Sequence, residues 1–363
     1  MNKKNILISA YSLDIGGIEK SLINLSNVLL KEGYKMTIVL EKKQGVLLDQ
    51  LNKNIKVIEY TPSNHINKII RKATNGLKRI LFMFKYAKKF SVAISFATYS
   101  KAGSILARTA SKNSVLWVHA DYLSLYDGDK KQVKEFFEGI QYKKFKKIVF
   151  VSNESKKNFD KICKYAGNLF VINNLIDGDE IQRLANEEIQ IEKNRDKYTF
   201  INVGRHDEKQ KKLLRILEVT KILKEKKYNF EVLFIGDGPD TKLYEKYIEE
   251  NALEEYVKLL GRKTNPYPYY QISDCVVLSS DYEGYPVVLL ESYILNKPII
   301  TTKVSDYEEV EEGHGIVTQK NVTDICCAME RMINNKNIKV KEFDYKLYNQ
   351  EILKNINKTI GKE

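Results

Sequence analysis

Short apolar runs recur along the whole chain and alternate with longer segments in which apolar residues return every three or four positions. A short continuous apolar run is typical of a buried strand, and the longer spacing is typical of an amphipathic helix. The runs lie at 5–10, 35–40, 91–97, 114–120, 147–152, 198–205, 230–240, 257–262, 275–280, 297–304 and 315–318. Strands that alternate with helices form parallel sheets covered by helices, so the pattern predicts an α/β fold in both halves of the chain.

The domain organisation follows from the length of the chain and from one polar stretch. A chain of 363 residues is long enough for two domains of ordinary size. The polar stretch 178–197 is typical of a linker. We therefore expect an N-terminal domain over 1–180, a C-terminal domain over 181–340, and closing helices over 341–363 that pack back on the first domain.

The charge of the chain is concentrated in its first half. Residues 1–180 hold 31 Lys and Arg against 16 Asp and Glu, whereas residues 181–363 hold 29 against 31. Between residues 61 and 120 there are eleven basic residues and no acidic one. The first half therefore presents a positive surface, which nucleic acid, anionic lipid or a polyanionic acceptor could bind.

One segment of this basic half, residues 65–90, has apolar residues at helical spacing and basic residues on the other positions. Gly76 could divide it into two helices. One interpretation is a surface helix whose basic face is solvated. The other is a helix that docks on an anionic membrane or acceptor through Lys78, Arg79, Lys88 and Lys89.

Other classes of protein are disfavoured by composition and by missing motifs. No run approaches the ~18 apolar residues of a membrane-spanning helix, and the apolar start of the chain is too short for a signal peptide. The cysteines Cys163, Cys275, Cys326 and Cys327 have no metal-ligand spacing, which favours reduced thiols in the cytoplasm. The chain has no G-x-G-x-x-G motif, so a nicotinamide or flavin enzyme is not expected.

The most informative stretch runs from Ser279 to Ser292 and reads SSDYEGYPVVLLES. A strand ends in two serines, a turn of Glu283-Gly284-Tyr285-Pro286 follows, and an apolar helix carries Glu291. Pro286 suits the first position of a helix, where its missing N–H costs nothing. A helix that begins here directs free backbone N–H groups towards the strand ends, which favours an anionic ligand.

This string resembles the sugar-donor motif of the family 4 retaining glycosyltransferases, which has two glutamates, with glycine, an aromatic residue and proline after the first. The resemblance implies the GT-B architecture, in which two Rossmann-like parallel-sheet domains face a central cleft. It implies that Glu283 holds sugar hydroxyls and helps to stabilise oxocarbenium-like charge. It also implies that Glu291 holds the ribose hydroxyls and that Gly284, Tyr285 and Pro286 line the donor site.

Two cations are expected beside this motif. Arg205 ends a predicted strand, and Lys211 lies near the start of the following helix, an arrangement that suits a diphosphate. In the family an Arg and a Lys in this order bind the nucleotide diphosphate. Lys211 fits the register of the residues that follow it best, and Lys212 and Lys209 remain alternatives.

The first domain is expected to contribute three more residues to the site. Gly16 and Gly17 lie between a strand and a helix, where a backbone can approach a ligand closely. In the family a glycine pair at this place lies against the donor phosphates, and a histidine at a strand end faces the transferred sugar. His119 is therefore a catalytic candidate beside Glu283, and Asp121 could orient it.

The resemblance predicts a retaining, metal-independent hexosyltransferase. It would move a sugar from a nucleotide diphosphate sugar, UDP-linked by expectation, to a growing glycan or a lipid-linked acceptor in bacterial surface polysaccharide or capsule synthesis. We expect no cofactor, no metal and no nucleic-acid partner, and a location at the inner face of the cytoplasmic membrane. The alternatives are a sugar-nucleotide epimerase or phosphorylase of the same fold, a basic nucleic-acid-binding protein, and an inactive partner subunit.

Overall fold

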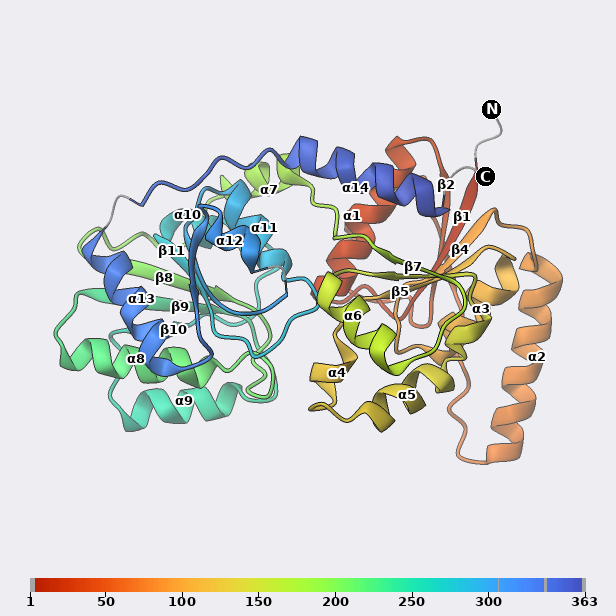
Figure 1. Ribbon diagram of the computed structural model, residues 1–363, viewed down its shortest axis with the longest axis horizontal. Helices are drawn as coiled ribbons and strands as arrows, with labels where there is room; N and C mark the ends of the chain where they lie inside the picture. The colour runs from red at the N-terminus through yellow and green to blue at the C-terminus, as the bar shows by residue number, and fades with distance from the viewer. Residues whose placement is uncertain (1–3, 306, 336–337, 361–363) are drawn as a thin grey trace. The chain divides into compact units, whose positions relative to one another are not determined.

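The computed structural model describes residues 4–305, 307–335 and 338–360. The chain divides into two compact units, Met1–Ile176 with Asn349–Glu363, and Asp177–Tyr348. The division after Ile176 falls slightly before the expected one at 180/181. Figure 1 shows that each unit is built around a sheet with helices packed on it.

The first unit contains a seven-stranded sheet in the order β3-β2-β1-β4-β5-β6-β7, and every neighbouring pair is parallel. Its strands are β1 (Asn5–Ala10), β2 (Lys35–Leu40), β3 (Lys56–Glu59), β4 (Val92–Ser95), β5 (Ser114–Val118), β6 (Lys147–Phe150) and β7 (Asn168–Val171). Its helices are α1 (Gly17–Lys31), α2 (Lys68–Tyr86), α3 (Lys101–Ala110), α4 (Tyr122–Leu125), α5 (Lys130–Gly139) and α6 (Asn153–Ile162). The central strands are buried on both faces, which is why they read as continuous apolar runs.

The closing segment forms one helix among the described residues, α14 (Tyr345–Ile360), whose last turns belong to the first unit. Ile352, Ile356 and Ile360 are buried, and they recur every four residues along one face of the helix. The helix is also tied by hydrogen bonds, from the Tyr34 hydroxyl to Asn357 (2.7 Å) and from the Lys147 ammonium to the carbonyl of Thr359 (2.6 Å).

The second unit contains a six-stranded parallel sheet in the order β10-β9-β8-β11-β12-β13. Its strands are β8 (Tyr198–Val203), β9 (Phe230–Ile235), β10 (Val257–Leu259), β11 (Cys275–Leu278), β12 (Ile299–Thr302) and β13 (Gly315–Thr318). Its helices are α7 (Gly178–Ala185), α8 (Leu213–Glu225), α9 (Thr241–Glu250), α10 (Tyr267–Ile272), α11 (Val287–Ile294), α12 (Glu308–Glu311) and α13 (Val322–Asn334). Its core lies between the sheet and the buried faces of helices such as α8 and α13.

The stretch expected to be a linker, 178–197, begins with helix α7, so that expectation is wrong for its first part. The side chain of Asp177 caps the helix by accepting a hydrogen bond from the backbone N–H of Glu180 (3.2 Å). Ile181 and Ala185 are buried one turn apart. Only these two positions of the helix are both apolar and fully buried, and the charged residues around them hid the pattern.

The strand order of each sheet reverses at one place, between β1 and β4 in the first unit and between β8 and β11 in the second. In an open parallel sheet, ligands bind beyond the carboxyl ends of the strands at such a switch point. In the second unit the loop after β8 begins at Gly204 and the loop after β11 begins at Ser279. The two stretches with the strongest chemical signal in the sequence therefore meet at one edge of one sheet.

Candidate active site

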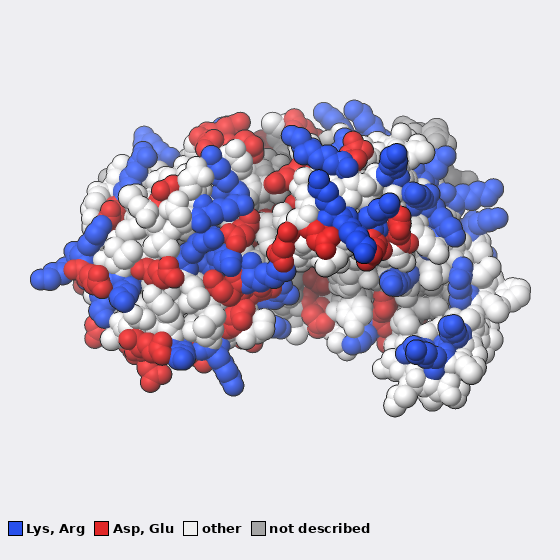
Figure 2. Space-filling view, turned by 60° about the horizontal axis from the view of Figure 1, so that its bottom comes forward, with Lys and Arg blue, Asp and Glu red and all other residues white. Residues whose placement is uncertain are grey.

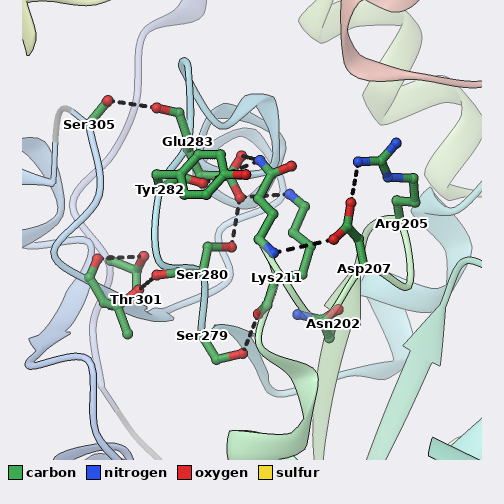
Figure 3. Close-up of polar contacts among 12 residues, drawn as sticks. Asn202, Arg205, Asp207, Lys211, Ser279, Ser280, Tyr282, Glu283, Thr301 and Ser305 are labelled. Carbon is green, nitrogen blue, oxygen red and sulfur yellow. Dashed lines mark hydrogen bonds and ion pairs between the residues drawn. The ribbon is translucent and has the colours of Figure 1, made fainter. Parts of the chain in front are cut away.

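Hydroxyl groups fix the loop that follows β11. The Ser279 hydroxyl donates a shared hydrogen bond to the carbonyls of Lys211 (2.8 Å) and Lys212 (2.9 Å), which ties this loop to the start of α8. The Ser280 hydroxyl donates to a carboxylate oxygen of Glu283 (2.7 Å), and the Ser305 hydroxyl donates to the Glu283 backbone carbonyl (2.8 Å). Figure 3 shows the contacts of Ser280 and Ser305 meeting at the turn that carries Glu283.

The buried carboxylate of Glu283 lies against a lysine. Its Oε1 accepts hydrogen bonds from Lys211 Nζ (2.6 Å) and from Ser280 (Figure 3). Its Oε2 accepts one from the side-chain amide of Gln210 (3.3 Å). The side chains of Lys211 and Glu283 are 18% and 8% exposed. An ion pair held by additional hydrogen bonds and largely shielded from water fixes both side chains in position.

The local fold distinguishes Lys211 from Lys212, one of the two alternative lysines. The backbone N–H of Lys211 donates to the carbonyl of Asp207 (2.7 Å), and the chain then turns through Lys212, which has a left-handed conformation (φ 52°) at the start of α8. This turn directs Lys211 towards Glu283, whereas the ammonium group of Lys212 lies 3.8 Å from Asp281. Of these two lysines, the one preferred from the sequence register is the one that contacts Glu283.

Arg205 lies in the loop after β8, and its guanidinium group pairs with the carboxylate of Asp207. The Arg205 side chain is 61% exposed, so it reaches into solvent beside the Lys211–Glu283 pair (Figure 3). Asn202, the second-last residue of strand β8, donates a side-chain hydrogen bond to the carbonyl of Val277 (2.7 Å) and connects β8 to β11. The two cations expected at this edge therefore stand on loops that a direct strand-to-strand contact holds in place.

Glu291 lies on α11 and accepts hydrogen bonds from two tyrosine hydroxyls of α10, those of Tyr267 and Tyr270 (3.0 Å each). Glu291 is 7% exposed. Burial, together with the neighbouring charge of Glu291, raises the pKa of both tyrosines well above the ordinary value, so the two hydroxyls stay protonated and act as donors. This contact could not be predicted from the sequence, because tyrosines that hold a carboxylate and tyrosines that only fill a core have the same sequence pattern.

The turn between Glu283 and α11 differs from expectation by one residue. Pro286 precedes the helix in an extended conformation (ψ 101°), and Val287 is the first helical residue. Pro286 was expected at the first helical position, and that assignment is wrong because its backbone does not continue into the helical region. Tyr285 is buried, and its hydroxyl lies 3.3 Å from that of Tyr348. Gly284, which lies between Glu283 and Tyr285 in the chain, is partly exposed.

In the first unit, Gly16 and Gly17 begin helix α1. Gly16 is the capping residue, with an extended backbone (φ −173°), and Gly17 is the first helical residue. The carboxylate of Glu19 folds back over this end, where a Cβ added to Gly16 would lie 2.3 Å from Oε2 of Glu19. Burial raises the pKa of Glu19. The helix end expected to receive an anion is thus already faced by a carboxylate of the chain itself.

His119 follows β5 directly and packs against Phe96, with ring centroids 4.2 Å apart. Burial lowers its pKa to about 3, so the imidazole is neutral. Its Nε2 atom has no hydrogen-bond partner among the residues that the structure describes. Asp121 does not orient the ring as expected: its carboxylate caps α4 through the N–H of Leu123 (3.2 Å) and accepts hydrogen bonds from Ser124 and Asn158.

The remaining residues singled out from the sequence lie on or just after α2. Lys78 is half-buried and donates to the carbonyl of Thr61 (2.7 Å), whereas Arg79, Lys88 and Lys89 are exposed. Within residues 4–305, 307–335 and 338–360, no group of three or more His, Cys, Asp or Glu side chains is placed to hold a metal ion. No helix in the same ranges is long and apolar enough to cross a membrane.

The fold and the motifs define a two-unit α/β protein of the glycosyltransferase class, and comparison with known families agrees. Residues 15–180 match the model of Glycosyltransferase Family 4, and residues 185–350 match that of Glycosyl transferases group 1. The two matches together span most of the chain. The chain therefore belongs to the glycosyltransferase family that these two models describe, and it has the GT-B fold. The fold class expected from the sequence is confirmed.

Individual relatives fit this assignment. The chain is 30% identical over 177 residues to the capsular polysaccharide biosynthesis glycosyltransferase CapH of Staphylococcus aureus, which covers 46% of this chain and 45% of CapH. Over 316 residues (83% of this chain, 81% of the relative) it is 24% identical to a Campylobacter jejuni N-acetylgalactosamine-N,N'-diacetylbacillosaminyl-diphospho-undecaprenol 4-alpha-N-acetylgalactosaminyltransferase.

Among solved structures, Anabaena HepE in complex with UDP and glucose is similar in fold, with a TM-score of 0.77, 18% identity, and coverage of 98% of this chain and 99% of HepE. The chain spans about half the length of the curated relatives that it matches at 30% identity. At these levels of similarity the comparisons fix the family and the fold.

Proposed function

We propose that this protein transfers a sugar from a nucleotide diphosphate sugar, UDP-linked, to a glycan or lipid-linked acceptor, with retention of anomeric configuration. The observation that carries the proposal is the buried pair of Lys211 and Glu283 at the switch point of the second sheet, with Arg205 beside it. Glycosyl transfer needs fixed positive charge where the leaving diphosphate forms, and a carboxylate near the sugar.

The pairing of each cation with a carboxylate explains how the site can receive a diphosphate. In the structure Lys211 pairs with Glu283 and Arg205 pairs with Asp207, so the cations are held in place and their charge is balanced. A diphosphate between them would compete for both cations and would leave Glu283 free to accept hydrogen bonds from sugar hydroxyls. Negative charge that grows on the diphosphate as the glycosidic bond breaks would then meet two preorganised positive groups.

The same arrangement supports a metal-independent reaction, because the two side-chain cations supply the charge that Mg²⁺ supplies in other phosphate-transfer sites. We assign the ribose hydroxyls to Glu291, whose carboxylate the hydroxyls of Tyr267 and Tyr270 hold in one orientation. The choice of UDP rests on HepE, whose structure contains UDP and glucose.

The choice of acceptor rests on the names of the relatives, one a capsular polysaccharide enzyme and the other a transferase acting on a diphospho-undecaprenol-linked sugar. An acceptor on a lipid diphosphate places the reaction at the inner face of the cytoplasmic membrane. The positive charge of the first half of the chain suits such a surface.

A direct experiment is to incubate the purified protein with a panel of UDP-sugars and undecaprenyl diphosphate-linked acceptors. We expect UDP release only when an acceptor is present, and a product whose anomeric configuration by NMR matches that of the sugar donor. Asp281→Asn serves as a control on the same loop, because Asp281 pairs with Arg215 and Lys212, whereas Lys211 pairs with Glu283 and Arg205 pairs with Asp207. Rapid epimerisation of the nucleotide sugar without acceptor, or tight and salt-sensitive binding of DNA or RNA instead of transfer, would contradict the proposal.

A further inference from the structure

Helix α2 has an apolar face that points away from its own unit. The helix is continuous through Gly76, and of its residues only Phe82 is buried. Large apolar side chains are exposed along the helix and its N-terminal approach: Ile66, Ile69, Ile70, Leu77, Ile80, Leu81, Met83 and Phe84. Ile69 and Phe84 are 78% and 81% exposed. An exposed apolar stripe of this length is unusual on a soluble surface and marks an interaction site.

The polar face of α2 is the one that packs on the unit. Asn75 exchanges hydrogen bonds with the backbone N–H (2.7 Å) and carbonyl (3.2 Å) of Ser63, and Lys78 donates to the carbonyl of Thr61. Phe82 packs edge-on against Tyr60 with ring centroids 5.9 Å apart. These positions recur every three or four residues, so they form one stripe along the helix.

The two stripes lie on opposite sides of the helix. At about 100° per residue, positions two residues before and after Phe82 lie roughly 200° around the helix, and these are the exposed Ile80 and Phe84. The orientation of α2 is thus the reverse of an ordinary surface helix, which buries its apolar face and exposes its polar one. The expectation of a solvated basic face is incomplete, because the solvent-facing side is chiefly apolar.

Basic side chains border the apolar stripe. Lys68, Lys72, Arg79 and Lys85 are exposed on the helix, and Lys88 and Lys89 are exposed just after it. Figure 2 shows blue and white atoms, and no red ones, at the lower right of the molecule, where α2 comes forward. The positive charge continues along the unit at Arg108, whose guanidinium carbon lies 5.5 Å from the ring centre of Phe145. Burial, and then the charge of Arg79, lower the pKa of Arg108.

Phe145 in turn lines a recess of about 700 Å³ that also contains Lys143, Lys146 and Lys164. The basic surface beyond α2 therefore includes three lysines that line this recess. This combination of an apolar stripe and flanking cations suits a surface that is apolar inside and anionic at its border.

We infer that α2 lies in the plane of an anionic membrane and inserts its apolar stripe into the boundary between headgroups and acyl chains. A second copy of α2 is a poor occupant, because residues 61–120 hold eleven basic residues and no acidic one, so two such faces would repel each other. An anionic bilayer satisfies both features at once. The proposed function explains why the protein would need to bind a membrane, and the inference rests on it for that reason alone.

The test compares two triple variants of the full chain. The first is Ile69→Gln, Leu77→Gln and Phe84→Gln, which removes the apolar stripe without touching the packed face of α2. The control is Val46→Gln, Leu243→Gln and Leu347→Gln, three exposed apolar residues elsewhere. We expect the wild-type protein and the control to float with vesicles of phosphatidylcholine and phosphatidylglycerol, and the α2 variant to lose at least tenfold in binding. Vesicles of phosphatidylcholine alone should bind weakly.

A fluorescence measurement reports insertion directly. The chain has one tryptophan, Trp117, which is buried in β5, so Phe84→Trp adds an exposed reporter. Its emission should shift to the blue with anionic vesicles and be quenched by brominated acyl chains. Unchanged emission, or flotation of the α2 triple variant like that of the wild type, would overturn the inference. So would a dimer in sedimentation that the triple variant converts to monomer, because the stripe would then join two copies.

These outcomes are separate from those of the proposed function. Vesicle binding is measured without nucleotide sugar, and transfer is measured with a water-soluble acceptor. The α2 triple variant should keep its transfer rate on that acceptor. Vesicle binding without any transfer would support the membrane inference and contradict the proposed activity. Transfer without vesicle binding would support the proposed activity and contradict the membrane inference.

Discussion

At the scale of single residues, Lys211 and Glu283 form a buried ion pair whose members are expected to separate during the reaction. A buried charge that loses its partner is costly, so the pair stabilises the site only while both groups are present. This predicts strong coupling between the two positions in stability, in addition to their effect on transfer.

We expect Lys211→Met alone to destabilise the fold by about 3–5 kcal/mol, because it leaves the Glu283 carboxylate buried without a cation. The double variant with Glu283→Gln should recover most of this loss, as judged by urea denaturation, while transfer stays reduced by about 10²–10³-fold. Additive effects on stability would show that the two side chains do not depend on each other in solution.

His119 predicts a dependence of stability on pH. Burial lowers its pKa from 6.5 to about 3, so the unfolded chain binds a proton between these values while the folded chain does not. The contribution of His119 to the free energy of unfolding is therefore complete above about pH 6.5 and is lost as the pH falls towards 3. His206 and His314 also have lowered pKa values, so the informative quantity is a difference between variants.

Urea midpoints at pH 7.5 and pH 5 check this prediction. His119→Gln should narrow the gap between the two midpoints relative to the wild type. His65→Gln, which changes an exposed histidine, is the comparison variant. Equal gaps in all three proteins would mean that the folded chain protonates His119 as easily as the unfolded one.

At the scale of elements, α10 and α11 are joined by the contacts of Tyr267 and Tyr270 with Glu291. Replacing both tyrosines by phenylalanine removes two donors to a buried carboxylate, which costs about 1–3 kcal/mol for each unsatisfied bond. We expect weaker binding of UDP by calorimetry as well, because Glu291 loses its fixed orientation. Tyr269→Phe is the matched control, since no hydroxyl hydrogen bond is described for Tyr269 on the same helix; a control as damaging as the double variant would contradict this account.

Helix α14 is expected to hold to the first unit through its buried isoleucines. Ile356→Ala should lower the free energy of unfolding by about 2–5 kcal/mol, because the side chain is 1% exposed and leaves a cavity. Leu347→Ala, near the start of the same helix and 55% exposed, should change it by less than about 0.5 kcal/mol. Urea denaturation of the two variants measures the contrast, and equal effects would mean that the C-terminal turns do not contribute to the core.

The sequence predicted elements well where burial left a strong pattern and poorly where it did not. The central strands, such as β1 and β11, are buried on both faces, so their apolar runs were visible. The edge strands β3 and β7 are only half-buried and carry mixed residues, so no run marked them. Periodicity also located α2, but it could not show which face of the helix would pack, because that depends on partners distant in the sequence.

The candidate site, too, could be predicted from the sequence only in part. The string from Ser279 to Ser292 and the register around Lys211 were readable because loops at strand ends keep the order of the chain. The contact of Glu291 with α10 was not readable, since it joins residues more than twenty positions apart through two hydroxyl groups. The role of Asp121 was misjudged because a neighbour in sequence at a helix start turns its side chain to the backbone.

At the scale of the whole molecule, the chain carries a net charge of +13, and two sets of its positive groups differ in exposure. The first unit displays them around α2, whereas in the second unit Arg205 and Lys211 lie at one sheet edge, each balanced by a carboxylate. Interactions of the exposed cations around α2 should weaken as the salt concentration rises, because exposed charges are screened over about 10 Å at 0.1 M salt. The attraction between Lys211 and Glu283 should change little with salt concentration, because the pair is buried.

Removal of divalent metal tests whether these two cations are sufficient for the reaction. If Arg205 and Lys211 neutralise the leaving diphosphate, transfer in the presence of EDTA should proceed at the rate seen with added Mg²⁺, within about a factor of two, whereas Lys211→Met should lose about 10²–10³-fold under both conditions. Rates are measured from UDP release with a fixed concentration of a water-soluble acceptor, so that membrane binding does not enter. Activity that disappears in EDTA and returns with Mg²⁺ or Mn²⁺ would show that a metal ion carries the leaving-group charge and that the paired cations have another role.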